Sequence, residues 1–238
     1  MTEKTSLTRR RLRTPRAAAL AGIAFAVLMI ISLVLIRISV PERLDVSGQW
    51  LEEYAQRIAF AIGLIPFAGI AFLWFLGVIR DRLGDFEDRF FSTVFFGSGL
   101  LYLAMTFVSA AIAASLVNIY SAGPYALLET PTYAFNRVFM YQVTNVYGQR
   151  MAGVFMLSLG TIWIRTKVMP RSITFLTYGL ALVQLLGLNL SLWFSLAFPG
   201  WVFVISVAIL IFNFRQNKAQ VSDGMGDEVS PAEKTLID

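Results

Sequence analysis

Long apolar runs separated by short polar segments are the main pattern along this chain. A transmembrane helix needs about 20 mainly apolar residues to cross a hydrocarbon core roughly 30 Å thick, and several of these runs reach that length. The pattern predicts an all-α membrane protein with six transmembrane helices. The predicted spans are 17–40, 58–79, 90–117, a fourth that ends near 164, and two within 172–214.

The last apolar run predicts two helices rather than one. As a single helix, residues 172–214 would be roughly 65 Å long, twice what a bilayer accepts. The segment WFSLAFPGW, from Trp193 to Trp201, is the predicted turn. Pro199 and Gly200 interrupt a helix there, and tryptophan favours the interfacial layer of a membrane.

The distribution of lysine and arginine predicts the orientation. Six of the twenty precede the first span, and three lie in each of the second-to-third loop, the fourth-to-fifth loop and the carboxyl tail. By the positive-inside rule these segments face the cytoplasm, so both termini are predicted there. The predicted organisation is a basic cytoplasmic tail over 1–16, a six-helix transmembrane domain over 17–214 and a disordered cytoplasmic tail over 215–238. The net charge of +5 belongs to the same signal and indicates no nucleic-acid partner.

The side chains that most enzymes use are scarce in this composition. Of the residues, 57% are hydrophobic and 15% charged, and cysteine and histidine are both absent. Their absence excludes disulfides, thiolate nucleophiles, a histidine general base and histidine or cysteine ligands for zinc, copper or haem. All fifteen acidic residues fall in predicted loops, tails or helix ends, whereas proton- and cation-coupled carriers usually keep one at membrane depth. We expect no catalytic residue and no metal site, and the sequence implies no cofactor.

The fourth predicted span is unusual because its apolar part is too short to cross a bilayer. The helix has to extend backward through VFMYQVTNVYGQR. Gln142, Asn145 and Gln149 then share one helical face, and Arg150 follows next to it. Two depths are open for this arginine. If the helix begins near Asn145, Arg150 snorkels to the outer surface, and if it begins near Val138, the arginine lies near mid-depth and needs a partner.

The fifth predicted span carries a polar stripe of its own, at Thr174, Thr177, Gln184 and Ser191. Such a stripe either hydrogen-bonds to a neighbouring helix or, facing the fourth span, encloses a polar cavity with it. The residues assigned to this candidate cavity are Gln142, Asn145, Gln149, Arg150 and Gln184.

The segment GVIRDRLG joins the second and third predicted spans. It resembles the G-x-x-x-D-R-x-G pattern in the cytoplasmic loop between helices two and three of major facilitator transporters. In that family the pattern's aspartate, which matches Asp81, caps a helix and pairs with arginine, and each half of the carrier has six spans. The candidate residues of this loop are Gly77, Asp81, Arg82, Gly84 and Asp88.

A longer segment, PFAGIAFLWFLGVIRDRLGDFEDRFFSTVFFGSGLL from Pro66 to Leu101, resembles a stretch of uncharacterised small multi-span membrane proteins of actinobacteria and other bacteria. The resemblance implies a multi-pass protein of the bacterial inner (plasma) membrane and brings no activity with it.

Two functions remain open on this sequence, and both are non-enzymatic. The first is an accessory or assembly subunit of a membrane complex, with another protein or a second copy of the chain as its partner. The alternative is a small channel-like or carrier-like bundle that passes a solute through a polar cavity near the fourth and fifth helices. Polar stripes around a wet cavity favour passage of a solute, whereas stripes consumed by helix contacts favour a protein partner.

Overall fold

Helices account for all regular secondary structure in the part of the chain that the structure describes. This computed structural model describes residues 2–40, 50–83, 89–123, 131–167, 169–186 and 192–211. The helices are α1 (Thr2–Ser39), α2 (Trp50–Leu83), α3 (Arg89–Ala122), α5 (Pro131–Tyr141), the π-helix η1 (Gln142–Gly148), α6 (Gln149–Thr166), α7 (Arg171–Leu186), the 3-10 helix η2 (Leu192–Leu196) and a last helix over 197–211. The predicted basic tail is thus helical from Thr2 and continuous with the first span. The predicted tail over 215–238 lies outside the described residues.

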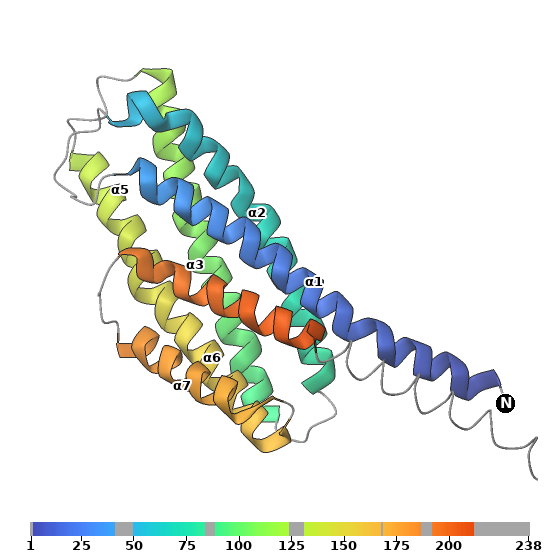
Figure 1. Ribbon diagram of the computed structural model, residues 1–238. Helices are drawn as coiled ribbons and strands as arrows, with labels where there is room; N and C mark the ends of the chain where they lie inside the picture. Colours follow the sequence, from blue (N-terminus) through green and yellow to red (C-terminus); the bar gives the residue numbers. More distant parts are fainter. Residues whose placement is uncertain are drawn as a thin grey trace, which may run out of the picture.

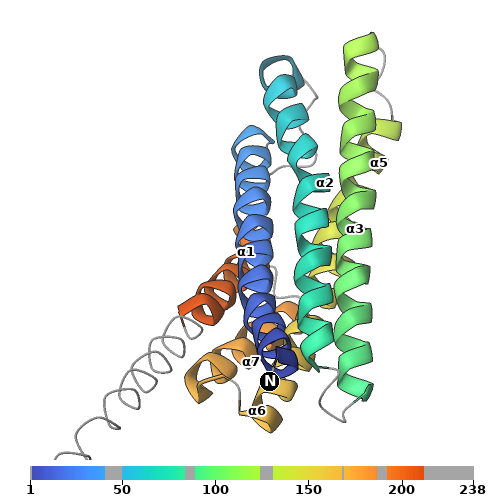
Figure 2. The same ribbon diagram turned by 90° about the vertical axis from the view of Figure 1, so that its right-hand side faces the viewer.

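The long helices α1, α2 and α3 lie side by side along the bundle (Figures 1 and 2). Four segments are long and apolar enough to cross a membrane: Ala17–Ser39, Glu53–Asp81, Phe90–Ser121 and Trp193–Ile211. The first three segments match the predicted first, second and third spans, and the fourth covers the last part of the final apolar run. The chain is therefore an α-helical membrane protein, as its hydrophobic pattern predicts.

A continuous helical rod of α5, η1 and α6 stands where the sequence predicts the fourth span. As predicted, this rod begins well before the short apolar part of the segment. At its other end, α6 ends at Thr166. Lys167 follows with a left-handed φ of 53°, and its N–H donates to the carbonyl of Trp163 at 2.9 Å, which closes the helix. The predicted fifth span is α7, whose 16 residues make it a shorter apolar helix. Neither the rod nor α7 is among the four segments of membrane-spanning length and hydropathy.

The turn after α7 differs from its predicted position. The sequence predicts it between Trp193 and Trp201, but residues 197–201 are α-helical and η2 precedes them. Pro199 lies in the first turn of the α-helical part, just after η2, where the helix changes from 3-10 to α geometry and a missing N–H is tolerated. Proline is therefore accommodated at the start of a helix here, and the chain reverses before it rather than at it.

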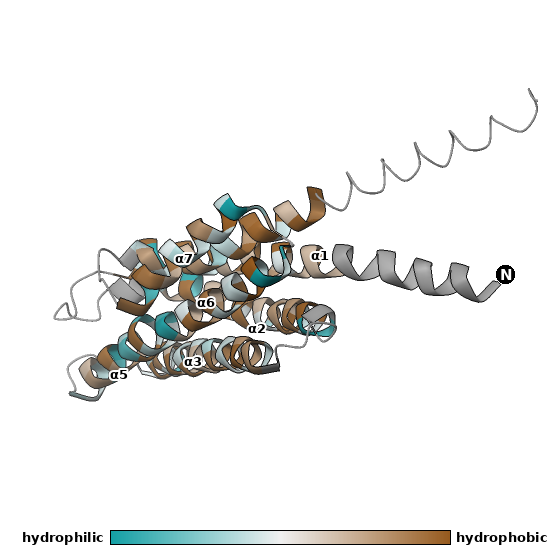
Figure 3. Ribbon diagram, turned by 90° about the horizontal axis from the view of Figure 1, so that it is seen from below, coloured by the Kyte–Doolittle hydropathy of each residue, from teal (hydrophilic) through white to brown (hydrophobic). Residues whose placement is uncertain are grey.

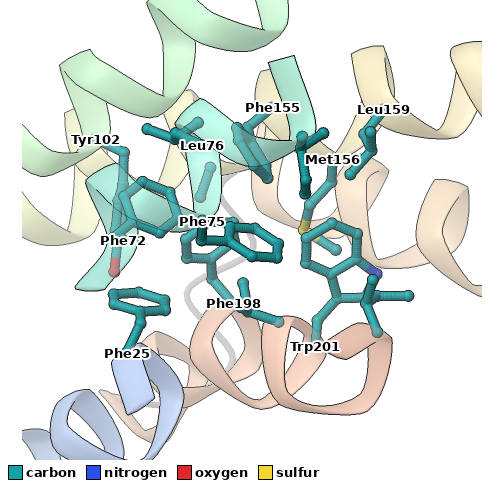
Figure 4. Close-up of a cluster of buried hydrophobic side chains, with 14 of the residues drawn as sticks. Phe25, Phe72, Phe75, Leu76, Tyr102, Phe155, Met156, Leu159, Phe198 and Trp201 are labelled. Atoms are coloured by element: carbon teal, nitrogen blue, oxygen red, sulfur yellow. The ribbon is translucent and has the colours of Figure 1, made fainter. Parts of the chain in front are cut away.

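The core of the bundle is an aromatic cluster around Phe72 of α2 (Figure 4). Phe72 is fully buried. Its ring centroid lies 4.6 Å from that of Phe25 in α1, 5.8 Å from Tyr102 in α3, 5.8 Å from Phe155 in α6 and 5.9 Å from Phe198 in the last helix. One side chain thereby joins α2 to four other helices.

The outside of the bundle is apolar as well. Phe60, Phe67 and Trp74 of α2 are 62%, 63% and 70% exposed, and many residues along α2 and α3 are hydrophobic (Figure 3). Patches of this kind are rare on soluble proteins, whereas the hydrocarbon of a bilayer solvates them without cost. The lipid bilayer is thus the expected surrounding of this surface.

Candidate functional site

A partly open cavity of about 200 Å³ is lined mainly by α1, α2, α3, α5 and η1, with one residue each from α6 and η2. It lies where α1 ends and α2 begins, away from the amino-terminal part of α1 (Figure 1). A single water needs only about 10–15 Å³ of such space, so the cavity can hold a small organic group or part of a lipid. No described residue of α7 lines it, so it does not lie between the fourth and fifth predicted helices.

Most of the cavity wall is apolar. Ile58 and Ile62 of α2 pack with Leu116 and Val117 of α3 and with Tyr133 of α5 to form a buried cluster separate from the one around Phe72. All five side chains line the cavity. A wall of this composition suits a hydrocarbon chain and offers little to a fully polar solute.

Two arginines line the same cavity. Arg37, near the end of α1, is half-buried, and its guanidinium carbon lies 5.8 Å from the centroid of the Trp193 ring, at the start of the segment that leads to the last helix. Arg137 of α5 is only 4% exposed. No aspartate or glutamate is among the described residues that line the cavity. Arg37 stands two residues before the end of the membrane-spanning segment Ala17–Ser39, where a long cationic side chain can reach the membrane surface. Arg137 lies in α5, outside the four segments of membrane-spanning length and hydropathy.

Two other side chains in the wall, of Tyr133 and Gln149, have buried polar atoms with no hydrogen bond to any described residue. These atoms are the Tyr133 hydroxyl and Oε1 of Gln149. These side chains are 4% and 5% exposed. A buried polar group left unpaired costs about 1–3 kcal/mol. A polar ligand group bound in the cavity could hydrogen-bond to the Tyr133 hydroxyl and to Oε1 of Gln149 and so remove that cost.

The π-helix η1 determines which side chains of the α5–η1–α6 rod reach the cavity. The N–H of Gln149 donates to the carbonyl of Thr144, five residues back instead of four. The wider turn changes the helical register, and Tyr141, Thr144 and Asn145 line the cavity together with Gln149. Gln142, which regular helical spacing places on the same face, is exposed instead. Segments of π-helix are rare and frequently occur at functional sites.

Arg150 does not line this cavity. Its side chain is half-buried, and Nη1 donates to the carbonyl of Val146 in η1 at 3.1 Å. The acceptor of this hydrogen bond is a carbonyl within the π-helix itself. The structure therefore gives Arg150 a local contact within its own rod.

The polar stripe of α7 packs inside the bundle. Thr177 accepts a hydrogen bond from Nε1 of Trp201 in the last helix at 2.9 Å and donates to the carbonyl of Ile173 at 2.9 Å. Gln184 is fully buried, and its side-chain amide has no hydrogen-bond partner in the described part of the chain. Thr174 is buried too, and Ser191 lies outside the described residues.

The five residues assigned from the sequence to one polar cavity are therefore divided in the structure. Asn145 and Gln149 line the cavity, whereas Gln142, Arg150 and Gln184 are not in its wall.

The residues of the GVIRDRLG segment lie at the opposite end of α2 from the cavity (Figure 1). Gly77 and Asp81 are exposed, and a Cβ at Gly77 would meet open space. Arg82 belongs to α2, while Gly84 and Asp88 lie outside the described residues.

The sequence reasoning missed the two arginines of the cavity. Arg37 stands inside the first predicted span, where an ionised side chain is a signal in its own right. Arg137 stands in a segment treated as a loop, because the apolar part of the fourth span begins only after it. Nothing in the linear pattern shows that α1 and α5 bring these residues to one cavity, since that depends on helix packing.

The described residues contain no group of three or more acidic side chains placed to hold a metal ion. Comparison with known protein families, curated protein sequences and solved structures finds no match to this chain. The fold and the site together define an α-helical membrane protein with a partly open cavity that is apolar along most of its wall and carries arginine, tyrosine and amide groups.

Proposed function

We propose that this chain is a non-enzymatic, multi-pass protein of a bacterial inner membrane whose cavity binds an amphiphilic molecule from the bilayer. The support is the cavity itself, which combines a hydrocarbon-compatible wall with buried polar groups. An amphiphile satisfies both parts at once, because its chain contacts the isoleucine, leucine and valine side chains while its polar end reaches Arg37, Arg137 and Tyr133. Binding of this kind is the first step of a carrier-like role.

The proposal includes six spans with both termini in the cytoplasm. The positive-inside count supports it, and the rod of α5, η1 and α6 together with α7 would supply the fourth and fifth spans. Because the chain has no cysteine, single cysteines at Leu12, Ser47 and Gly84 can be labelled with a membrane-impermeant maleimide on intact spheroplasts. We expect labelling at Ser47 alone, and the other two should react only after lysis. Labelling of Leu12 without lysis would contradict the proposed orientation.

The accessory-subunit role is a second candidate. It is supported by the α7 stripe, because Thr174 and Thr177 are buried in helix packing rather than facing a wet channel. On this alternative, the cavity seats a structural lipid and the function resides in a protein partner.

The test of the proposed function fills the cavity. Ala113 of α3 lines it, so the Ala113→Phe substitution places a ring in the space that the ligand would use. Ala111, two residues earlier on the same helix, is exposed, and Ala111→Phe is the matched control. Each protein is purified from its own membrane, exchanged into lipid-free detergent and analysed by mass spectrometry for retained lipid.

We expect wild type and Ala111→Phe to retain a bound amphiphile and Ala113→Phe to lose most of it. Equal retention by all three proteins would show that the lipid binds elsewhere, and the proposed function would then fail. Recovery of the wild type with other protein subunits, independent of the Ala113→Phe change, would favour the accessory role.

A further inference from the structure

We infer that the amphiphile in this cavity carries a second polar group, a hydroxyl far along its chain, which binds where α3 faces η1. The inference rests on the proposed function, since it specifies the ligand of that same cavity. It concerns the far end of the ligand, which the apolar part of the wall leaves open.

Polar groups line the cavity at two levels of the rod formed by α5, η1 and α6. Tyr133 stands near the start of this rod, and Gln149 follows sixteen residues later in the same continuous helical run. At about 1.5 Å per residue, the two positions are separated by roughly 20–25 Å along the rod. One small head group that reaches Tyr133 therefore cannot also reach Gln149.

The second level of the cavity lies where α3 packs against η1. A Cβ built on Gly148 would stand 3.6 Å from Cβ of Met105. Oγ of Ser109, one turn further along α3, donates to the carbonyl of Met140 at 3.4 Å. These two contacts bracket η1, so the polar side chains of α3 and of η1 face the same part of the cavity. We call this part the α3–η1 site, and its polar lining consists of Thr106, Ser109, Thr144, Asn145 and Gln149.

Several oxygens in the α3–η1 site are available only as hydrogen-bond acceptors. The hydroxyl of Thr106 donates to the carbonyl of Tyr102 at 2.9 Å, and the hydroxyl of Ser109 is used by Met140, so each oxygen keeps only its acceptor capacity. Oε1 of Gln149 accepts no hydrogen bond from any described residue, although the side chain is only 5% exposed. A ligand group that binds here therefore has to bring a donor.

A hydroxyl suits the α3–η1 site better than an ether or an amine. It donates to an oxygen such as Oε1 of Gln149, and its own oxygen accepts from an amide N–H of Gln149 or Asn145. An ether oxygen only accepts, and an ammonium group only donates. Between this site and Tyr133, Ala110 and Ala113 line the cavity and suit a hydrocarbon chain. The ligand class is therefore an amphiphile with a hydroxyl far along its chain from its first polar group.

The experiment compares chains that differ only at one end. Delipidated protein in neutral detergent is titrated with α,ω-diols of increasing length, using native mass spectrometry, to find the length that binds most tightly. At that length the diol is compared with the primary alcohol, with the monomethyl ether of the diol and with the amino alcohol. We expect the diol to bind at least about fivefold tighter than the other three, because each net hydrogen bond between neutral groups is worth roughly two- to tenfold in affinity.

Substitutions assign the second hydroxyl to the α3–η1 site. Gln149→Met and Thr106→Val keep the side-chain size and remove an acceptor, so each should lower the preference for the diol at least about twofold, while affinity for the primary alcohol stays the same. Gln149→Met is the variant expected to keep its fold, because Oε1 has no partner among the described residues. Gln142→Met on η1 and Ser115→Ala on α3 are the matched controls, since both residues are exposed and outside the cavity wall. Both should keep the wild-type preference.

The outcomes separate the inference from the proposed function. If the diol and the primary alcohol bind equally, and Ala113→Phe abolishes both, the cavity binds amphiphiles and only the inference about the second hydroxyl is wrong. If the methyl ether or the amino alcohol binds as tightly as the diol, the second group is not a hydroxyl and the inference is overturned. A diol preference that survives both Gln149→Met and Thr106→Val would place the hydroxyl elsewhere and overturn it too. If Ala113→Phe leaves all binding intact, the proposed function and the inference both fail.

Discussion

At the scale of single residues, glycine decides how closely α6 and α7 approach. A Cβ built on Gly153 lies 2.9 Å from Cγ of Leu185 and 3.1 Å from the carbonyl oxygen of Ala181. The backbone carbonyl cannot move aside without shifting α7. We therefore expect Gly153→Ala to lower the free energy of unfolding by about 1–2 kcal/mol, because the steric cost exceeds the gain in helix propensity.

The control for this prediction is Gly179 on α7, where a Cβ would meet nothing within 4 Å. Gly179→Ala should leave the stability unchanged or raise it by up to about 1 kcal/mol. The two variants are compared by their thermal unfolding midpoints in one detergent. A Gly153→Ala protein as stable as Gly179→Ala would mean that α6 and α7 are not packed this closely.

At the scale of elements, the π-helix η1 holds about one residue more than a regular helix needs for the same rotation between α5 and α6. Its seven residues turn the chain about as far as six residues of a regular helix at roughly 100° each, so deleting one residue restores a regular helix and leaves the orientation of α5 nearly unchanged. Tyr147 is the suitable residue to delete, because its side chain is 59% exposed and its loss empties no packed space. We expect Tyr133 and Arg137 to stay in the cavity wall after the deletion, so that lipid retention stays near that of the wild type.

Tyr147→Ala is the matched control, since it removes the same side chain and keeps the length of the rod. It should retain lipid as the wild type does, and both proteins should elute as single folded species on size exclusion. Loss of lipid after the deletion, to the level of the Ala113→Phe variant, would show that the cavity needs the π-helix itself and not only the orientation of α5.

At the scale of the whole molecule, Phe72 connects helices that are far apart in the sequence. It is fully buried and touches rings from α1, α3, α6 and the last helix. Lipid chains are as apolar as a protein core, so such contacts stabilise a membrane bundle through packing rather than by removal from water. We expect Phe72→Ala to cost about 3 kcal/mol, at the low end for loss of a core aromatic ring.

Phe67 on the same helix provides the comparison, because it is 63% exposed on the outer face of α2. Phe67→Ala should change the unfolding midpoint little, since lipid replaces the lost contacts. Resistance to detergent-induced unfolding distinguishes the two variants. If both lost stability equally, the arrangement of α2 in the bundle would be wrong.

Much of the architecture could be predicted from the sequence. Apolar runs of membrane-spanning length follow from local composition alone, which is why α1, α2 and α3 coincide with predicted spans. The helix predicted to end near residue 164 does extend backward beyond its short apolar part, as the rod of α5, η1 and α6. Asn145 and Gln149 could be singled out as inward-facing candidates. The turn after α7 was misplaced, because Pro199 interrupts a helix only when it lies beyond the first turn.

The site itself depended on tertiary structure. Helical periodicity assumes 3.6 residues per turn, so it could not foresee that η1 exposes Gln142 while it keeps Asn145 at the cavity. Nor does any local pattern place Arg37 beside a cavity shared with Arg137, because that meeting requires α1 to pack against α2 and α5 against α3. Composition and hydrophobic length determined by themselves that this is a helical membrane protein. Helix packing alone decided which polar side chains share one cavity, because packing brings together residues that are far apart along the chain.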